Sequence, residues 1–378
     1  MDLSLTEIQV MLQNAATEFL EAQLPKQRVR EIDDSPTGYA EDLWRGMVDL
    51  GWAGMVIPEE YGGSGLGYTD LAVVYEKLGY FNYGGPLLDS TVQSANLILA
   101  SGSDDQKKTL LPAIAEGQQI FTVAFTEPEY GWGPESVKMQ ATQRNGNYVL
   151  NGTKVFIPWA HIADQLLVVA RTSQGSSADQ GLSVFIVDRT SKGVSTRLHY
   201  GWIGDKLNEV TFDNVEVPAA NLLGSADQAW SAIEDARDSA TLALSMYMAG
   251  GAQGAYEMCR NYSQTRIAFG VPIGTFQRVQ DHVIVALTEW EASKWTSFEA
   301  VWRKDSGHVD TKLGISMAKA VSSDGFSKAC DASHHVHAGI GTDLDFGLTN
   351  YTVRARTFQQ YLGDAIYHKK RMAQLMNL

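Results

Sequence analysis

The spacing of apolar residues changes twice along this chain, and this change constrains the fold more than any single motif. Up to about residue 118, apolar residues follow helical spacing, as in the series Ile8, Met11, Leu12, Ala15 and Phe19. From about 120 to 224, short runs rich in Val, Ile, Phe and Tyr have the period of two that is typical of strands. From about 226 the helical spacing returns. The sequence therefore predicts an α+β protein with helical regions on both sides of a β-region.

The first 118 residues predict several short helices. A capping-box pattern, Ser-Leu-Thr-Glu at 4–7, precedes the first amphipathic run. Further helices are expected at 41–50, 70–78 and 106–115. Between them, the stretch 58–63 contains one proline and two glycines, which predict a loop.

The middle region predicts short strands at 148–151, 153–157, 165–170, 182–187, 193–198 and 209–217. Turn signals separate them, notably Asn145-Gly146, Asn151-Gly152 and the Gly-Ser-Ser stretch at 175–177. Connections this short join antiparallel strands, because a parallel crossover needs a dozen residues or more. No glycine-rich phosphate loop follows any strand, so we expect a small β-barrel or sandwich and not a dinucleotide-binding unit of the Rossmann type.

The last region predicts four long helices, at 226–263, 277–305, 312–338 and 348–376. The stretch Gly-Val-Pro-Ile-Gly at 270–274 separates the first pair. Four long antiparallel helices favour a bundle. We therefore expect an N-terminal helical domain at 1–118, a central β-domain at 119–224 and a C-terminal four-helix bundle at 225–378.

The composition limits the cellular compartment and the kinds of partner that we expect for this protein. The formal charge of −14 argues against nucleic acid or an anionic membrane surface as a partner, because both favour basic patches. No apolar run reaches the roughly 18 residues of a membrane helix, and the polar start Met-Asp-Leu-Ser is not that of a secretory signal. Cys259 and Cys330 form no disulfide framework. We expect a cytoplasmic protein.

Five stretches in a fixed order carry a family resemblance. They read Pro-Glu-Glu-Tyr-Gly-Gly at 58–63, Phe-Thr-Glu-Pro at 125–128, Lys-Val-Phe-Ile-Pro at 154–158, Arg-Ile-Ala-Phe-Gly at 266–270 and His-Ala-Gly-Ile-Gly-Thr at 337–342. Together with the helix–strand–helix order, they resemble the acyl-CoA dehydrogenase family over nearly the whole chain. The resemblance implies FAD as cofactor, an acyl-CoA as substrate, an oligomer formed through the bundle, and an electron-transfer flavoprotein as electron acceptor.

In the family, the second and third stretches face the flavin ring, which implies contacts from Phe125, Thr126, Phe156 and Ile157. Aimed donors stabilise the negative charge that a flavin gains on reduction. However, Pro158 stands where the family has a threonine, and it offers neither a hydroxyl nor an N–H. A turn at 125–128 and an ordinary apolar strand at 154–158 are the purely structural alternatives.

The chain also departs from the family directly after 125–128. Small residues usually follow there, and their amides and hydroxyl reach phosphate. This chain has Glu-Tyr-Gly-Trp at 129–132 instead. These bulky and acidic residues put phosphate binding by this loop in doubt.

The fourth and fifth stretches resemble those that reach the FAD of a neighbouring subunit, which implies roles for Arg266, Phe269, Gln277, Gly339 and Gly341. A planar guanidinium suits a pyrophosphate, and glycines allow close approach of the backbone. The alternatives are an arginine that caps a helix and a plain helix C-cap. His334, His335 and His337 lie beside this turn, but no carboxylate or thiol motif accompanies them, so we expect no metal site.

The usual catalytic base is missing. In the segment ARTFQQYLGDAIY at 355–367, Leu362 stands where most members of the family carry a glutamate, and the alternative position on the first bundle helix, 240–246, also has no carboxylate. Asp364 and Asp89 are the candidate replacements. Asp364 could alternatively bind a ribose hydroxyl, and each could be a plain surface or capping aspartate.

These observations predict an FAD-dependent component for α,β-dehydrogenation of an acyl-CoA thioester with a bulky or cyclic acyl group. We expect it to be one subunit of a hetero-oligomer whose homologous partner supplies the base. Two alternatives stay open. One is a self-sufficient homotetrameric flavoenzyme with an aspartate base, either a dehydrogenase or similar to nitroalkane oxidase. The other is a non-catalytic structural subunit.

Overall fold

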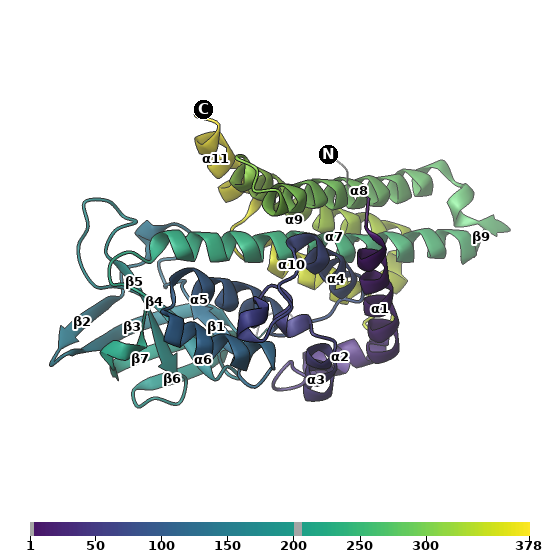
Figure 1. Cartoon of the computed structure of the whole chain (residues 1–378). Coiled ribbons are helices and arrows are strands. Elements are labelled where there is room, and N and C mark those ends of the chain that lie inside the picture. Colours follow the sequence, from purple (N-terminus) through teal and green to yellow (C-terminus); the bar gives the residue numbers. More distant parts are fainter. Residues whose placement is uncertain (1–3, 200–205) are drawn as a thin grey trace. The chain divides into compact units, whose positions relative to one another are not determined.

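The computed structural model describes residues 4–199 and 206–378 (Figure 1). Residue contacts divide the chain into two compact units. The first unit comprises Met1–Asp34, Gly67–Gly84 and Thr241–Leu378, and the second comprises Ser35–Leu66 and Gly85–Ala240. The N-terminal helical region thus contributes to both units. The boundaries at 118/119 and 224/225 stay predictions.

The first unit is helical. It contains α1 (Glu7–Gln23), α2 (Lys26–Asp34), α4 (Tyr68–Tyr80), most of α7 (Trp230–Thr265), α8 (Gln277–Asp305), α9 (Thr311–His337), α10 (Leu348–Gln360) and α11 (Ala365–Leu375). The helices α8 and α9 run along each other (Figure 1). The prediction of a single helix over 348–376 is wrong. Leu362 and Gly363 have φ values of 60° and 108°, which no α-helix accommodates, and they separate α10 from α11.

The start of α1 also differs from the prediction. The capping box is formed by Thr6 and Gln9, not by residues 4–7. The Thr6 hydroxyl accepts from the Gln9 amide at 3.3 Å, and the Gln9 side chain accepts from the Thr6 amide at 3.0 Å. The motif, Ser or Thr followed three residues later by Gln or Glu, also occurs with Thr6 in first place. Thr6 lies immediately before the first helical residue, so this copy of the motif forms the cap.

In the first unit, α4 and α7 cross at two glycines. A Cβ atom on Gly79 would lie 1.8 Å from the Tyr247 carbonyl oxygen, and one on Gly250 would lie 1.8 Å from the Glu76 carbonyl oxygen. Such close approach of two helix backbones is possible only without side chains at both positions. Buried ion pairs then join other helices of this unit, such as Arg354 on α10 with Asp33 on α2.

The second unit is a sheet covered by short helices. The helices are α3 (Glu41–Asp49), the π-helical η3 (Leu88–Ser94), α5 (Ala95–Ser101) and α6 (Asp104–Ala115). The strands are β1 (Phe121–Ala124), β2 (Gln140–Arg144), β3 (Asn147–Pro158), β4 (Gln165–Arg171), β5 (Leu182–Asp188), β6 (Val194–His199), β7 (Leu207–Val217) and β8 (Leu222–Leu223). The apolar core joins α5 and α6 to β1, β4, β5 and the start of α7.

The strand order is β6-β7-β3-β2-β4-β5-β8, and β1 pairs with β4. The expected hairpin at Asn145-Gly146 is present, with positive φ at both residues as a two-residue turn requires. Two expectations are wrong. The sheet is mixed and not purely antiparallel, because β1 runs parallel to β4. Asn151-Gly152 is not a turn but a register shift within β3, where the two predicted strands are one.

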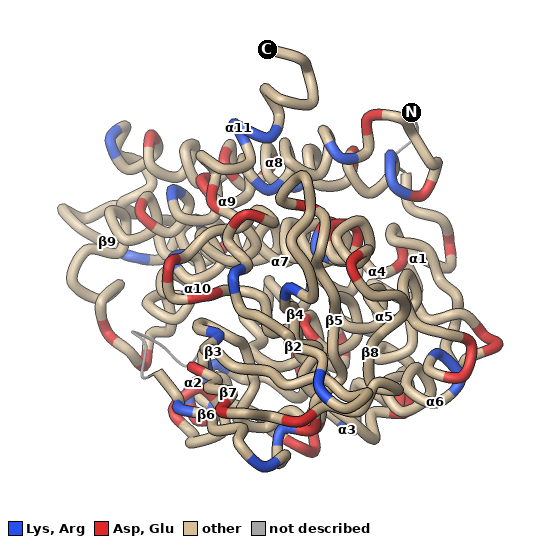
Figure 2. Tube along the Cα trace, turned by 90° about the vertical axis from the view of Figure 1, so that its left-hand side faces the viewer, with Lys and Arg blue, Asp and Glu red and all other residues tan. Residues whose placement is uncertain are grey.

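The helical, β and helical regions predicted from the periodicity are thus confirmed as an α+β fold. Among the described residues, the structure contains no helix with the length and apolarity that a membrane span needs. Figure 2 shows Lys and Arg interspersed with Asp and Glu along the chain.

Candidate functional site

The structure distributes the predicted site residues over its two units. Phe125, Thr126, Phe156, Ile157 and Asp89 belong to the second unit. Those of the first unit are Arg266, Phe269, Gln277, Gly339, Gly341, Leu362 and Asp364.

In the second unit, a bulge in β3 exposes the aromatic ring that is expected to cover a flavin. The register with β7 shifts between Lys154 and Ile157. Phe156, inside this shift, has a φ of 55° and is 46% exposed, whereas Ile157 is buried. Only Phe156 of these two therefore presents its side chain for stacking.

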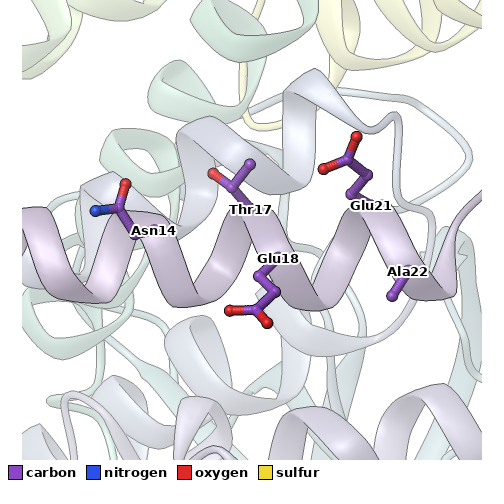
Figure 3. A pocket seen from close by; sticks show the side chains of 5 residues that line it. All are labelled: Asn14, Thr17, Glu18, Glu21 and Ala22. Carbon is purple, nitrogen blue, oxygen red and sulfur yellow. The ribbon is translucent and has the colours of Figure 1, made fainter.

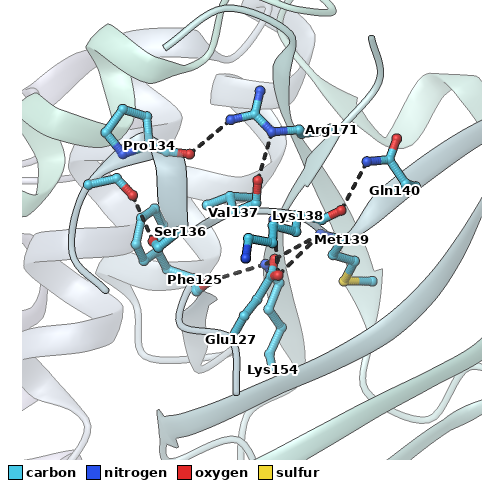
Figure 4. Close-up of polar contacts among 11 residues, drawn as sticks. Phe125, Glu127, Pro134, Ser136, Val137, Lys138, Met139, Gln140, Lys154 and Arg171 are labelled. Carbon is cyan, nitrogen blue, oxygen red and sulfur yellow. Dashed lines mark hydrogen bonds and ion pairs between the residues drawn. The ribbon is translucent and has the colours of Figure 1, made fainter. Parts of the chain in front are cut away.

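A buried ion pair fixes the backbone on both sides of Thr126 (Figure 4). The Lys154 ammonium donates to the Phe125 carbonyl at 3.1 Å and to the Glu127 carboxylate at 2.8 Å, and both charged side chains are almost fully buried. Burial lowers the pKa of Lys154 to about 8, against the opposing effect of Glu127. The Thr126 carbonyl in turn accepts from the Val155 amide at 2.8 Å. Thr126 is therefore held rigidly, and its hydroxyl has no partner among the described residues.

The loop after residue 128 is also fixed, in a form that does not favour phosphate. Arg171 donates to the carbonyls of Pro134 and Val137 at 2.9 and 2.7 Å (Figure 4), and Arg237 donates to the Trp132 carbonyl. Tyr130 contacts Phe156 edge-on, with 5.9 Å between ring centroids. Side-chain rings thus occupy the loop where the family resemblance implies small residues. Pro158 lies in β3 opposite Leu207 and has no hydrogen to donate.

In the first unit, a small hairpin carries the residues expected to reach a neighbour's FAD. Its strands are β9 (Ile267–Ala268) and β10 (Val271–Pro272), and Phe269 at its tip is 96% exposed. Arg266 and Gln277 flank the hairpin and are exposed. Within the described part of the chain, no side chain binds the Arg266 guanidinium. The hairpin therefore presents a cation, an amide and an aromatic ring together.

The glycine turn η7 (Ala338–Thr342) follows α9, and its two predicted glycines differ in environment. Open space surrounds the place of a Cβ on Gly339, so a ligand has access to the backbone there. A Cβ on Gly341 would lie 3.0 Å from the His334 ring and from the His337 side chain, so Gly341 is needed for internal packing. His334 contacts the Thr352 hydroxyl at 2.7 Å. The described residues contain no group of three potential metal ligands.

The candidate bases have defined structural surroundings. Asp364 is the N-cap of α11, and its carboxylate accepts from the Tyr367 amide at 2.7 Å. Leu362 is buried, and its carbonyl lies 3.2 Å from the His368 ring nitrogen. Asp89 is only 3% exposed and lies on the π-helix η3, a rare conformation that is frequent at functional sites. The capping alternative for Asp364 is therefore realised.

Sequence reasoning missed the Lys154–Glu127 pair, the loop contacts of Arg171 and Arg237, and the buried Lys319 on α9. One signal was available for Lys154, because a lysine inside an apolar strand requires a buried acceptor. The partner, 27 residues away, carried no such signal.

Apart from these residues, a surface pocket of about 350 Å³ lies along α1 (Figure 3). It is lined by Asn14, Thr17, Glu18, Glu21 and Ala22. These residues all belong to one helix, and none of them belongs to either site set.

Comparison with known proteins agrees with the arrangement. Family models of the acyl-CoA dehydrogenase N-terminal, middle and C-terminal domains match residues 6–118, 122–215 and 228–376. Acryloyl-CoA reductase (NADH) of Anaerotignum propionicum is 30% identical over 375 residues, covering 98% of this chain and 94% of that protein. The structure of glutaryl-coenzyme A dehydrogenase with glutaryl-CoA is 27% identical with a TM-score of 0.92, covering 100% of this chain and 97% of that one. The Tcur3481–Tcur3483 steroid ACAD is 29% identical with a TM-score of 0.86, covering 98% of both chains. The chain belongs to the acyl-CoA dehydrogenase family of FAD-dependent oxidoreductases acting on CH–CH donors.

Proposed function

We propose that this chain is one subunit of a mixed acyl-CoA dehydrogenase oligomer, in which a homologous chain supplies the catalytic base. The observation that carries the proposal is the α10–α11 turn. Leu362 stands at the usual position of the base, and the carboxylate of Asp364 is engaged in capping α11. Bound FAD supplies the oxidant for α,β-dehydrogenation of the thioester.

The missing base is the reason for a partner. Abstraction of the proton α to a thioester requires an acceptor within hydrogen-bond reach. An aliphatic side chain at 362 cannot accept a proton, and the buried stretch 240–246 on α7 holds only Thr241 and Ser245 as polar groups. The Ser245 hydroxyl donates to the Thr241 carbonyl at 2.8 Å within the helix.

The cofactor-facing residues support a shared FAD. Arg266, Phe269 and Gln277 are exposed. The Arg266 guanidinium suits the pyrophosphate of a cofactor held mainly by another chain. In the second unit, Thr126 and Phe156 fit a flavin ring, but Pro158 offers it no donor, and bulky side chains fill the loop at 129–132 where phosphate would be bound. The residues therefore fit a cofactor held mainly by a neighbouring chain better than one held by this chain alone.

The direct test is purification with and without the products of neighbouring genes, scoring flavin absorbance per chain. We expect the chain alone to be almost colourless, and to co-purify with a homologous chain as a yellow complex that oxidises acyl-CoA. A homo-oligomer of this chain that is fully loaded with FAD and oxidises acyl-CoA by itself would refute the proposal.

Gly339 offers a second prediction. In the yellow complex, Gly339→Ala and Gly339→Val should weaken FAD retention progressively, by about tenfold (1.4 kcal/mol) for valine, because a side chain blocks close approach of the ligand. Stability should change by no more than about 0.5 kcal/mol, since the space at this Cβ is open. Equilibrium dialysis of FAD and urea unfolding separate the two effects. Equal FAD retention in all three proteins would exclude Gly339 from the site.

The buried Asp89 favours one alternative, a self-sufficient enzyme with an aspartate base. Asp89→Asn and Asp364→Asn, followed by flavin reduction under anaerobic substrate, distinguish the candidates. Asparagine caps helices about as well as aspartate, so Asp364→Asn preserves the start of α11. If neither substitution slows reduction in the isolated chain, this alternative fails.

A further inference from the structure

Lys319 on α9 is a charged side chain that neither the cofactor contacts nor the base argument uses. It is completely buried in the first unit. Its ammonium donates to the Ser323 hydroxyl at 2.8 Å, to the Phe358 carbonyl at 3.0 Å and to the Gln359 carbonyl at 3.3 Å. All three hydrogen-bond acceptors are neutral.

Such an arrangement is unfavourable for stability in itself. An ammonium group loses its hydration on burial, and neutral acceptors compensate less than a carboxylate does. Burial lowers the pKa of Lys319 to about 7, whereas the charges of Asp364 and Asp324 act in the opposite direction. A methionine or leucine would fill the same space without this penalty. The position of the ammonium indicates why a lysine is nevertheless present.

The two carbonyls that accept from Lys319 belong to Phe358 and Gln359, directly before Gln360, the last residue of α10. The final carbonyls of a helix have no partner within the helix, and a cation at this end is favourable for the helix dipole. The chain then enters the turn Tyr361–Asp364. On the far side of this turn, the Leu362 carbonyl contacts His368, and Asp364 caps α11.

The turn is also tightly packed. A Cβ on Gly363 would lie 2.5 Å from the Tyr367 ring and 2.8 Å from the His368 ring. The turn therefore has little freedom on the α11 side, and Lys319 binds the helix end on the α10 side.

We propose that Lys319 is a positioning residue, which ends α10 at Gln360 and thereby sets where Leu362 and Asp364 stand. Burial of its ammonium lowers the free energy of unfolding. Its contribution to the protein is a fixed conformation of the turn between α10 and α11. The charges that act on it are those of Asp364 at the turn and Asp324 on α9 itself. On α11, His368 contacts the Leu362 carbonyl and Arg371 contacts the Ser316 hydroxyl of α9. On α8, Glu289 and Arg303 lie against Gly325 and Gly314, which are more than one turn of α9 away from Lys319.

The test compares Lys319→Met with Lys328→Met, a matched control on the same helix whose lysine is exposed and pairs with Glu289. Hydrogen exchange is measured on the isolated chain. The amides of Tyr361 and Gly363 donate to the Thr357 and Gln360 carbonyls. They should exchange about tenfold faster or more in Lys319→Met, because two hydrogen bonds to charge are lost. They should be unaffected in Lys328→Met. Unchanged exchange in Lys319→Met would overturn the proposal.

Stability against pH is the readout that an ordinary packing role would not change. Because the pKa of Lys319 lies near 7 in the folded chain and near 10.5 when unfolded, the unfolded chain binds one more proton between these values. The unfolding free energy of the natural chain, relative to Lys319→Met, should therefore rise as pH increases above 7 and be lowest below it. Parallel curves for the two proteins from pH 6 to 9 would contradict a buried, titrating Lys319.

Only the effect of Lys319 on substrate binding rests on the proposed function. In the mixed complex, Lys319→Met should raise the Kd for acyl-CoA about tenfold if the turn meets the substrate. Faster exchange at the turn with an unchanged Kd would support the positioning role and contradict the proposed placement of the turn, so the two ideas can fail separately.

Discussion

Replacing Gly250 by alanine is expected to lower the free energy of unfolding by more than about 3 kcal/mol. The new Cβ would lie 1.8 Å from the Glu76 carbonyl oxygen and 2.7 Å from its carbon. These are backbone atoms of α4, which cannot move aside as a flexible side chain can. A Cβ on Gly79 would lie equally close to the Tyr247 carbonyl oxygen at the same crossing, so the two helices have no slack there and must separate.

Urea unfolding of the purified chain measures this loss, and Gly314→Ala on α9 is the matched control. There the nearest atom to the new Cβ is Cδ of Arg303, at 2.7 Å, at the flexible part of a side chain. We expect a change within about 1 kcal/mol, since alanine also favours the helix by a similar amount. Equal losses in Gly250→Ala and Gly314→Ala would mean that α4 and α7 do not cross as closely as described.

This crossing illustrates what the sequence could not reveal. Gly79 and Gly250 lie inside stretches with helical periodicity, and neither has a local signature. Their role depends on which helix lies opposite, which is a property of tertiary structure. In contrast, most of the helices and most strands followed from the spacing of apolar residues, because burial of one face imposes that spacing locally. The helices α2 and α5 were not predicted.

The candidate site also contains residues whose role could be predicted from the sequence and residues whose role could not. The hairpin residues Arg266 and Phe269 were recognisable, because a short motif with fixed spacing carries them. The break at Leu362 was missed, since helical spacing continues through it and the positive φ of a leucine cannot be read from residue type. Asp364 was identified as an acid, but its capping role depends on α11 starting there. The parallel pairing of β1 with β4 also escaped prediction. The two strands are separated by 40 residues, and no local pattern indicates that they pair.

Glu127→Ala is expected to destabilise the second unit by about 3–5 kcal/mol, because it leaves the buried Lys154 ammonium without its counter-charge. The amides of Lys138 and Met139, which donate to the same carboxylate at 2.9 and 3.0 Å, lose their acceptor as well. Glu209→Ala is the control. It breaks the Arg197–Glu209 pair on the surface, where the arginine side chain is 67% exposed, and should cost at most about 1 kcal/mol.

The pH dependence identifies the cause of this loss. Burial lowers the pKa of Lys154 to about 8, although the Glu127 carboxylate acts in the opposite direction. Removal of this carboxylate should therefore lower the pKa of Lys154 further. Because a lysine with a lowered pKa is destabilising while it is charged, the deficit of Glu127→Ala should be larger at pH 6 than at pH 8. Adding Lys154→Met to Glu127→Ala should restore part of the stability, since it removes the stranded charge, and the double-mutant cycle measures this coupling. Additive losses would show that the two side chains act independently. The backbone around Thr126 would then be held by the strand contacts of Val155 alone, and the loop that is expected to face the flavin would not depend on the ion pair.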